Sequence, residues 1–311
     1  MPQKVFITGA AGFIGSAVTE ELISHGYEVV GYARSDENAE QIKKNGGKVH
    51  RGDGLEDLES LKSGAAASDG VIHLAFVHDF SNFDRVCNID QAAIKAMGEG
   101  LAGTNKPLII VSGTLMFPKG QLATEDTEPE RGTPLSKRSE SIDLVKQLSK
   151  DINIRGMAVA LTPTVHGKGD KGFIPTLIDA AKKNGYATYI GDGSNVWPAG
   201  HRLDAATLLR LAFEKGKAGA VYNAVVEQGV SHKDIAEVVS KKLGIPAESK
   251  KPEEAMQILG FLGAVIGLHN PTSSEKTKKE LGWEPKQIGL LQDMEENYFI
   301  PGAGSKYVQG L

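Results

Sequence analysis

Three glycines near the N-terminus, Gly9, Gly12 and Gly15, have a spacing that could form a phosphate-binding turn. They follow a short apolar run and precede a segment in which apolar residues recur every four positions, as in an amphipathic helix. Glycines in such a turn let backbone N–H groups approach a pyrophosphate, and the partial positive charge of the helix N-terminus attracts it. The residues predicted to contact a dinucleotide cofactor here are Gly9, Ala11, Gly12, Phe13 and Ile14.

The residues after the second predicted strand indicate which dinucleotide cofactor the protein prefers. An acid at this point commonly holds the ribose 2′-hydroxyl of NAD. Here the strand leads into Ala33-Arg34-Ser35. A guanidinium and a hydroxyl suit a 2′-phosphate, because arginine can pair with it through two hydrogen bonds. We therefore predict that NADP(H) is preferred over NAD(H), with Arg34 and Ser35 as contacts, while the nearby Asp36 keeps NAD as the alternative.

The elements that would position these residues can be read from the apolar pattern. Short apolar runs without polar alternation are followed by helical patterns, which is typical of parallel strands covered on both faces. The predicted strands cover residues 5–7, 29–32, 71–74, 108–111, 157–161 and 221–226, and helices are expected over 137–151 and from Ser231 to the stop at 244–246. The pattern predicts an α/β fold with a Rossmann-like doubly wound parallel sheet and a smaller substrate-binding lobe.

We expect residues 1–166 and 201–226 to form the dinucleotide-binding domain. Residues 167–200 and 227–300 would form the substrate-binding lobe, and 301–311 a loose tail. The most apolar stretch, 256–268, is shorter than the roughly 20 residues that a transmembrane helix needs, so we interpret it as a buried helix or a pocket wall.

The amino-acid composition limits the kinds of molecule that the protein is expected to bind. The chain has 311 residues, 40% of them hydrophobic, and a formal net charge of −4, which argues against nucleic acid or an anionic membrane as the main partner. Cys87 is the single cysteine, so an intrachain disulfide is impossible, and no signal-peptide pattern opens the chain. We expect a cytoplasmic protein with a small-molecule substrate, and a homodimer remains an open option.

Several segments, taken together, resemble the extended short-chain dehydrogenase/reductases, the NAD-dependent epimerase/dehydratase family. The 8–15 turn matches the family's TGxxGxxG, and 279–285 is close to the LGWxP near its C-terminus. Other segments look like the family's adenine contact, its cofactor-lining segment after strand four and its nicotinamide-amide turn after strand six. The cofactor contacts that this resemblance implies are Asp53, Gly54, Leu74, Ala75, Phe76, Thr164 and Val165.

One departure from the family concerns its catalytic pair, Tyr-x-x-x-Lys. None of the seven tyrosines has a lysine four positions later, and the expected region around 133–140 contains no tyrosine. Ser112 and Thr114 stand where the family has its catalytic serine or threonine, so we expect these hydroxyls to polarise a substrate carbonyl. Lys137 or Arg138 could add positive charge, and Lys137 could donate a proton if desolvation lowers its pKa.

Substrate contacts are predicted from residues around the expected pocket mouth and from the glycine-rich segment that follows the sixth strand. They are His78, Trp197 and His201, with Trp197 either walling an apolar pocket or packing between the lobes. His73 lies in an apolar run and is interpreted as a core histidine. No His, Cys or Asp cluster has metal-ligand spacing, so no metal is predicted.

Three functions are compatible with this sequence. The first is an NADP(H)-dependent reductase or dehydrogenase that acts on a small carbonyl or alcohol. The second is a non-catalytic NADP(H)-binding sensor or interaction protein, which the missing tyrosine favours. The third is a nucleotide-sugar epimerase or dehydratase, which the missing tyrosine weakens because such an enzyme needs a base at a sugar hydroxyl.

Overall fold

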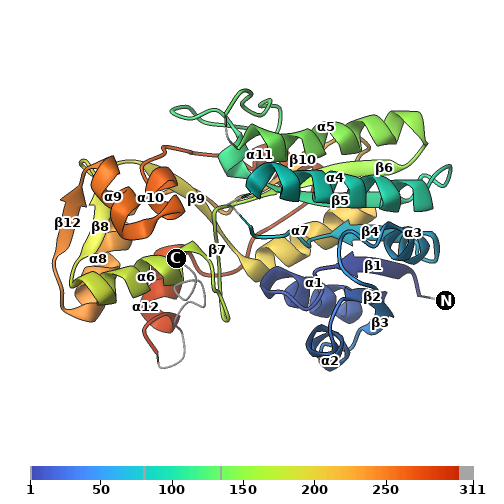
Figure 1. Cartoon of the computed structure of the whole chain (residues 1–311), viewed down its shortest axis with the longest axis horizontal. Coiled ribbons are helices and arrows are strands. Elements are labelled where there is room, and N and C mark those ends of the chain that lie inside the picture. Colours follow the sequence, from blue (N-terminus) through green and yellow to red (C-terminus); the bar gives the residue numbers. More distant parts are fainter. Residues whose placement is uncertain (1, 80–81, 134, 301–311) are drawn as a thin grey trace.

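A computed structural model describes residues 2–79, 82–133 and 135–300 (Figure 1). Its largest feature is a seven-stranded sheet of order β10-β6-β5-β4-β1-β2-β3, in which every neighbouring pair is parallel. The strands are β1 (Lys4–Thr8), β2 (Glu28–Ala33), β3 (Lys48–Arg51), β4 (Gly70–His73), β5 (Pro107–Gly113), β6 (Arg155–Leu161) and β10 (Val221–Ala224). The predicted Rossmann-like parallel sheet is confirmed. The tail predicted to be loose, 301–311, lies outside the described residues.

Helices cover both faces of this sheet. One face carries α1 (Phe13–Ser24), α2 (Asp36–Lys44), α7 (Arg202–Lys215) and α11 (Glu275–Leu281), and the other carries α3 (Leu58–Ala66), α4 (Phe83–Gly100) and α5 (Ser136–Asp151). A short 3-10 helix, η2 (Thr114–Met116), follows β5 directly. Each parallel connection passes over a face of the sheet, so the carboxyl ends of all seven strands meet at one edge.

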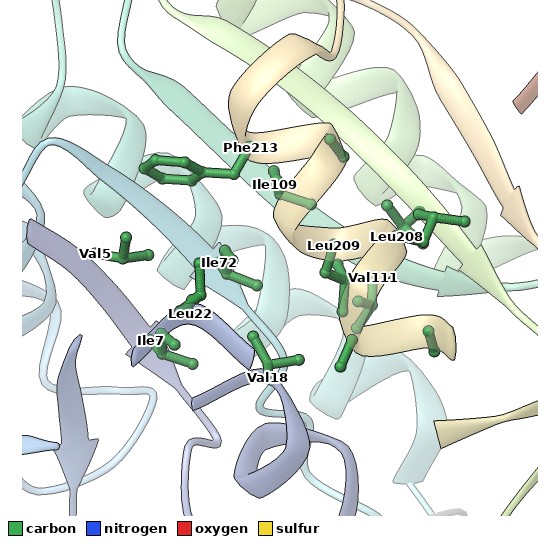
Figure 2. Close-up of a cluster of buried hydrophobic side chains, with 14 of the residues drawn as sticks. Val5, Ile7, Val18, Leu22, Ile72, Ile109, Val111, Leu208, Leu209 and Phe213 are labelled. Carbon is green, nitrogen blue, oxygen red and sulfur yellow. The ribbon is translucent and has the colours of Figure 1, made fainter. Parts of the chain in front are cut away.

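The central strands are largely apolar because both of their faces are buried. Figure 2 shows one side, where side chains of β1, β4 and β5 point toward α1 and α7. The labelled residues are Val5, Ile7, Ile72, Ile109 and Val111 from the strands and Val18, Leu22, Leu208, Leu209 and Phe213 from the helices. The alternate residues, among them Phe6, Leu108 and Ile110, pack on the other face with α4 and α5. Burial on both faces explains why these runs lack polar alternation.

A second lobe has its own core and lies at the left of Figure 1. It contains a sheet of order β11-β9-β7 and a two-stranded pair, β12-β8. These strands are β7 (Thr164–His166), β8 (Ala187–Ile190), β9 (Val196–His201), β11 (Glu227–Ser231) and β12 (Ala247–Lys250). The helices are α6 (Phe173–Asn184), α8 (His232–Leu243), α9 (Pro252–Leu259), α10 (Phe261–Val265) and α12 (Leu290–Asn297). β7 thus pairs outside the main sheet, although 1–166 was assigned to the dinucleotide-binding domain.

Local signals placed the start and the end of α8 correctly. The Asp234 N–H donates to the Ser231 hydroxyl at 3.0 Å at the start of α8, and Gly244 ends that helix with φ 66°. The 256–268 stretch differs from a single buried helix, because Gly260, with φ 57°, divides it into α9 and α10. Met256 is 52% exposed, so only part of this stretch is buried. No helix among the described residues is long and apolar enough to cross a membrane.

Candidate active site

The strand order reverses between β1 and β4, the two strands from which the chain winds in opposite directions across the sheet. In open parallel sheets, ligands bind in the crevice outside the carboxyl ends of the strands at such a switch point. The glycine turn follows β1 and the predicted 74–76 segment follows β4, so both lie at this crevice. The fold therefore brings two separately predicted cofactor segments to the same place.

The turn leaves backbone amides available at the start of α1. Gly12 is the N-cap, with no side-chain cap and no acidic residue in the first turn. The first amide with an acceptor within the helix is that of Ser16, which donates to Gly12 O at 2.9 Å. The amides of Phe13, Ile14 and Gly15 therefore face the end of the helix, where they suit an anion such as a pyrophosphate.

Two glycines allow the close approach of backbone segments in this turn. Gly9 has φ 73°, and a Cβ on it would lie 2.9 Å from the backbone nitrogen of Ala75. A Cβ on Gly15 would lie 2.0 Å from Gly9 O, so the helix packs directly on its own preceding turn. The Thr8 hydroxyl ties the turn to the β4 segment, since it accepts from Ala75 N at 3.3 Å and lies 2.6 Å from His73 Nδ1.

The end of β2 carries the charges that were predicted to select the dinucleotide. The Arg34 side chain is exposed and has no hydrogen-bond partner among the described residues. The Ser35 hydroxyl caps α2 by accepting from Asn38 N at 3.2 Å. Asp36 is paired with the Arg51 guanidinium at 2.7 Å, and Arg51 also donates to Ser35 O. Arg51 thus partly neutralises the one acid that was expected to favour NAD.

The predicted adenine contacts lie in the turn after β3. Asp53 is exposed, and its N–H donates to the Asp57 carboxylate at 3.1 Å. Gly54 O accepts from the Tyr32 hydroxyl at 2.8 Å, which fixes this turn against β2. The Asp53 carboxylate itself is exposed and has no hydrogen-bond partner among the described residues.

The two predicted catalytic hydroxyls lie where β5 ends. Ser112 and Thr114 are 7% and 0% exposed, and neither side-chain oxygen has a hydrogen-bond partner among the described residues. Buried polar atoms in proteins are nearly always paired, because an unpaired one costs about 1–3 kcal/mol. Two such hydroxyls beside a ligand crevice are therefore candidates for contact with a bound molecule.

Arg138 is the residue at the start of α5 that reaches into the protein. Its guanidinium is bonded to the Asp90 carboxylate and donates to Val111 O at 2.6 Å, next to Ser112. It also lies 4.4 Å from the centre of the Phe76 ring. Arg138 thus ties the end of β5, the β4 segment and α4 together.

Asp90 on α4 is the buried partner of this arginine. Burial opposes its ionisation, but the Arg138 guanidinium and the bond from His73 hold the pKa of Asp90 below its ordinary value. The Ser141 hydroxyl also donates to it at 2.7 Å. His73 lies 3.2 Å from Asp90 and has both ring nitrogens engaged, so its interpretation as a core histidine is confirmed. Asp90 was not found from the sequence, since its partner is 48 residues away.

Lys137 does not have the environment that its predicted role as a proton donor required. Its ammonium forms an ion pair with Glu140 at 2.7 Å on the outer side of α5. The hydrogen bond from this pair raises the pKa of Lys137 instead of lowering it. The expectation that desolvation makes Lys137 a proton donor is wrong, because the helix turns this side chain toward solvent and the buried one is Arg138.

The three predicted substrate contacts lie in different environments. His78 is exposed, with its ring 5.7 Å from that of Phe76. Trp197 is 1% exposed, lies against His232 and donates to Leu268 O at 3.1 Å. It belongs to the core of the second lobe, which corrects the expectation that it contacts a substrate. His201 caps α7 by accepting from Leu203 N at 3.2 Å.

The segment after β6 connects the two lobes. Thr164 donates to Pro198 O at 2.7 Å, and Val165 is partly buried beside it in β7. The next residue, His166, pairs with Asp293 at 2.7 Å, and the ligand atoms of His166, His201 and Asp293 all lie within 4.8 Å of one another. Sequence spacing could not reveal this group. Because His201 Nδ1 already accepts from a backbone N–H, its other nitrogen carries the proton in the neutral ring and is not a ready metal ligand.

Comparison with known proteins shows the family. The model of the NAD dependent epimerase/dehydratase family matches residues 5–225, which is most of the chain. An uncharacterized protein of Saccharomyces cerevisiae is 51% identical over 301 residues, covering 96% of this chain and all of that one. The chain therefore belongs to the NAD dependent epimerase/dehydratase family, as its motifs suggested.

Two further similarities are more distant. A 4-hydroxy-2-methyl-3-oxo-4-farnesyl-3,4-dihydroquinoline-1-oxide ketoreductase of Stigmatella aurantiaca is 25% identical over 281 residues, which covers 84% of this chain and 80% of that one. The crystal structure of UDP-glucose 4-epimerase from Thermotoga maritima superposes with a TM-score of 0.74 at 19% identity, over 94% of this chain and 96% of that one. Both oxidoreductases and sugar epimerases thus occur among the similar proteins, and the structural match supports the fold.

Proposed function

We propose that this protein is an NADP(H)-dependent reductase or dehydrogenase that transfers a hydride between the nicotinamide and a small carbonyl or alcohol. The observation that carries the proposal is the pair of buried, unpartnered hydroxyls of Ser112 and Thr114 at the carboxyl edge of the sheet. Ser112 lies on β5, the strand next to β4, and Thr114 directly follows it, beside the crevice that the glycine turn opens. A ketoreductase among the relatives agrees with this class of reaction.

The cofactor preference rests on the charges at the end of β2. A 2′-phosphate there would meet the Arg34 guanidinium and the Ser35 hydroxyl, both of which can donate hydrogen bonds to it. The competing acid, Asp36, is occupied by Arg51 at 2.7 Å. This arrangement favours NADP(H) over NAD(H).

Different residues of the chain would have different roles in carbonyl reduction. A bound nicotinamide cofactor supplies the hydride. The amides of Phe13 and Ile14 would hold its pyrophosphate, and the hydroxyls of Ser112 and Thr114 would donate hydrogen bonds to the substrate oxygen as negative charge develops on it. Arg138 is a positioning residue, because it holds Val111 O next to Ser112. A lone hydroxyl is a poor acid, so we assign delivery of the final proton to water.

A specific observation also favours a second function. The first turn of α5 contains Lys137 and Arg138 but no tyrosine, so the family's usual proton donor is missing from it. A protein that binds NADP(H) and signals its presence without turnover would have this site. This sensor differs from the reductase only in the absence of a reaction.

Oxidation of NADPH in the presence of a panel of small aldehydes, ketones and imines tests the proposal. We expect turnover with the wild-type protein and a loss of about 100-fold or more in kcat for the variant that combines Ser112→Ala with Thr114→Val. NADPH binding should be retained in that variant. Binding without turnover of any compound would support the sensor, and a cofactor released only on denaturation would support the epimerase class.

A further inference from the structure

Two more buried polar groups lie at the same edge of the sheet as Ser112 and Thr114. The oxygen atoms of the Thr162 hydroxyl and the Asn270 side-chain amide have no hydrogen-bond partner among the described residues. Thr162 is 5% exposed and Asn270 is fully buried. Thr162 begins the turn after the sixth strand that resembles the family's nicotinamide-amide contact, but no substrate role was predicted for it, and Asn270 was not found from the sequence.

The strand register brings Thr162 and Thr114 to the carboxyl ends of two neighbouring strands. The last residue pair between β5 and β6 joins Gly113 to Leu161. Thr114 and Thr162 are the first residues after β5 and β6, and Ser112 stands on the same face of the sheet as Ile110 and Leu108. Three residues with hydroxyl groups, at or just after the carboxyl ends of two neighbouring strands, therefore lie at the same edge of the sheet.

Asn270 reaches this edge from the segment that leads back out of the second lobe. Its Nδ2 donates to Thr114 O at 3.1 Å, and its backbone N–H donates to Val196 O on β9. With the amide nitrogen committed to Thr114, the Oδ1 atom is the free end of this side chain. An amide oxygen can only accept hydrogen bonds, whereas the three hydroxyls can donate or accept.

We propose that Thr162 and Asn270 complete the substrate site, and that the substrate is a small hydroxycarbonyl compound. Its carbonyl oxygen would accept from the Thr162 hydroxyl together with those of Ser112 and Thr114, and a hydroxyl on the neighbouring carbon would donate to Asn270 Oδ1. This inference rests on the proposed reductase function and names its substrate class. An amide oxygen without a donor is costly when buried, and a ligand that brings the donor offsets that cost.

Substrate pairs of matched size test the role of Asn270. Hydroxyacetone and butanone are one pair, and glycolaldehyde and propanal are another. We expect the wild-type protein to use the hydroxylated member of each pair with a kcat/KM at least about tenfold higher. In Asn270→Ala this preference should disappear. Equal use of both members by the wild-type protein would overturn the assignment of the substrate class.

The Thr162→Val substitution replaces the hydroxyl with a methyl group of nearly the same shape. It tests whether the Thr162 hydroxyl donates to the substrate, and it does so even if Asn270→Ala fails to fold. Its kcat/KM should fall by about tenfold or more on every substrate, with the Kd for NADPH and the melting temperature not worsened. Thr19→Val is the matched control, because the Thr19 hydroxyl is also buried and unpartnered but lies in the middle of α1. This control should behave as the wild type.

The outcomes separate failure of this inference from failure of the proposed function. A wild-type protein that reduces none of the carbonyl compounds contradicts the reductase itself. Turnover by the wild type together with equal rates for Thr162→Val and Thr19→Val contradicts the inference alone. A weaker Kd for NADPH in Thr162→Val, with kcat unchanged, would mean that the threonine contacts the carboxamide of the cofactor, and would also overturn the inference.

Discussion

The turn after β1 and the start of α5 follow the family pattern to very different degrees. The turn keeps all three glycines, and its helix opens with uncapped amides and no acidic residue. At the start of α5 the family's tyrosine is absent, and a buried arginine paired with Asp90 lies there instead. Cofactor binding and catalysis therefore depend on different features of this fold. Binding depends on the shape of the backbone, and catalysis depends on side chains that can be exchanged.

The largest expected effect concerns the turn. Gly15→Ala places a Cβ 2.0 Å from Gly9 O, so the helix must move away from the turn and its amides lose their alignment. We expect NADPH to bind at least about 100-fold more weakly in a calorimetric titration, as for loss of two hydrogen bonds to a charged group. Gly267→Ala is the control, because its Cβ would meet only side-chain atoms of Ile190 at 3.6 Å or more. Unchanged binding by Gly15→Ala would mean that the phosphates lie elsewhere.

The second prediction concerns the buried cation at the start of α5. Arg138→Met leaves Asp90 buried without its partner, which should lower the free energy of unfolding by about 3–5 kcal/mol. Arg131→Met is the matched control, because Arg131 pairs with Asp143 at the surface and its loss should cost about 1 kcal/mol or less. Urea unfolding measures both. Similar values for the two variants would show that the Arg138–Asp90 pair does not hold this region together.

A second buried carboxyl, Asp170, differs from Asp90 in having no arginine or lysine partner in the described structure. Burial raises the pKa of Asp170 to about 6, against the bonds that it accepts from the Tyr298 hydroxyl and Gly172 N. Between pH 4 and pH 6 the folded protein holds a proton that the unfolded chain has released. The unfolding free energy should therefore fall as pH rises through this range.

The expected size of this fall is about 3 kcal/mol, from a shift of roughly two pKa units. Asp170→Asn cannot release the proton, so its stability should vary less with pH than that of the wild type by this amount. Urea unfolding at a series of pH values gives both curves. If the stability of both proteins depends on pH in the same way, Asp170 has an ordinary pKa in the folded protein, and its burial without a cationic partner has no effect on stability.

The smallest expected effect concerns the end of β2. Arg34→Ala should raise the Kd for NADPH about tenfold, the value of one charge-assisted hydrogen bond, and leave the Kd for NADH unchanged. Lys44→Ala, which removes an exposed cation at the far end of α2, controls for a general effect of charge. Equal losses for both cofactors in Arg34→Ala would remove the basis for the NADP(H) preference.

The sequence predicted those parts of the molecule that depend on neighbours along the chain. The turn around Gly9 and the six apolar strands were found because their signals are local spacing and burial on both faces. The ends of strands were less certain: β5 continues to Gly113 and β10 ends at Ala224, where tertiary pairing rather than propensity decides. Hydroxyls at the end of β5 could be named, but not the fact that they lack partners.

The parts that could not be predicted depend on contacts between distant segments. Asn270 meets Thr114 across 156 residues, and Arg138 meets Asp90 across 48. The choice between Lys137 and Arg138 as the inward residue was equally hidden, since neighbouring positions on a helix point about 100° apart and only the packing of α5 selects one. Trp197 was misplaced because an aromatic residue in a glycine-rich segment suits a pocket wall and a core equally.

The central claim is that the amides at the start of α1 bind the pyrophosphate of NADP(H). Calorimetric titration of the full-length protein with NADPH, and separately with NADH, tests it most directly. From the proposed site we expect one NADPH bound per chain, more tightly than NADH. Absence of measurable binding to either cofactor would contradict both the site and the reductase built on it.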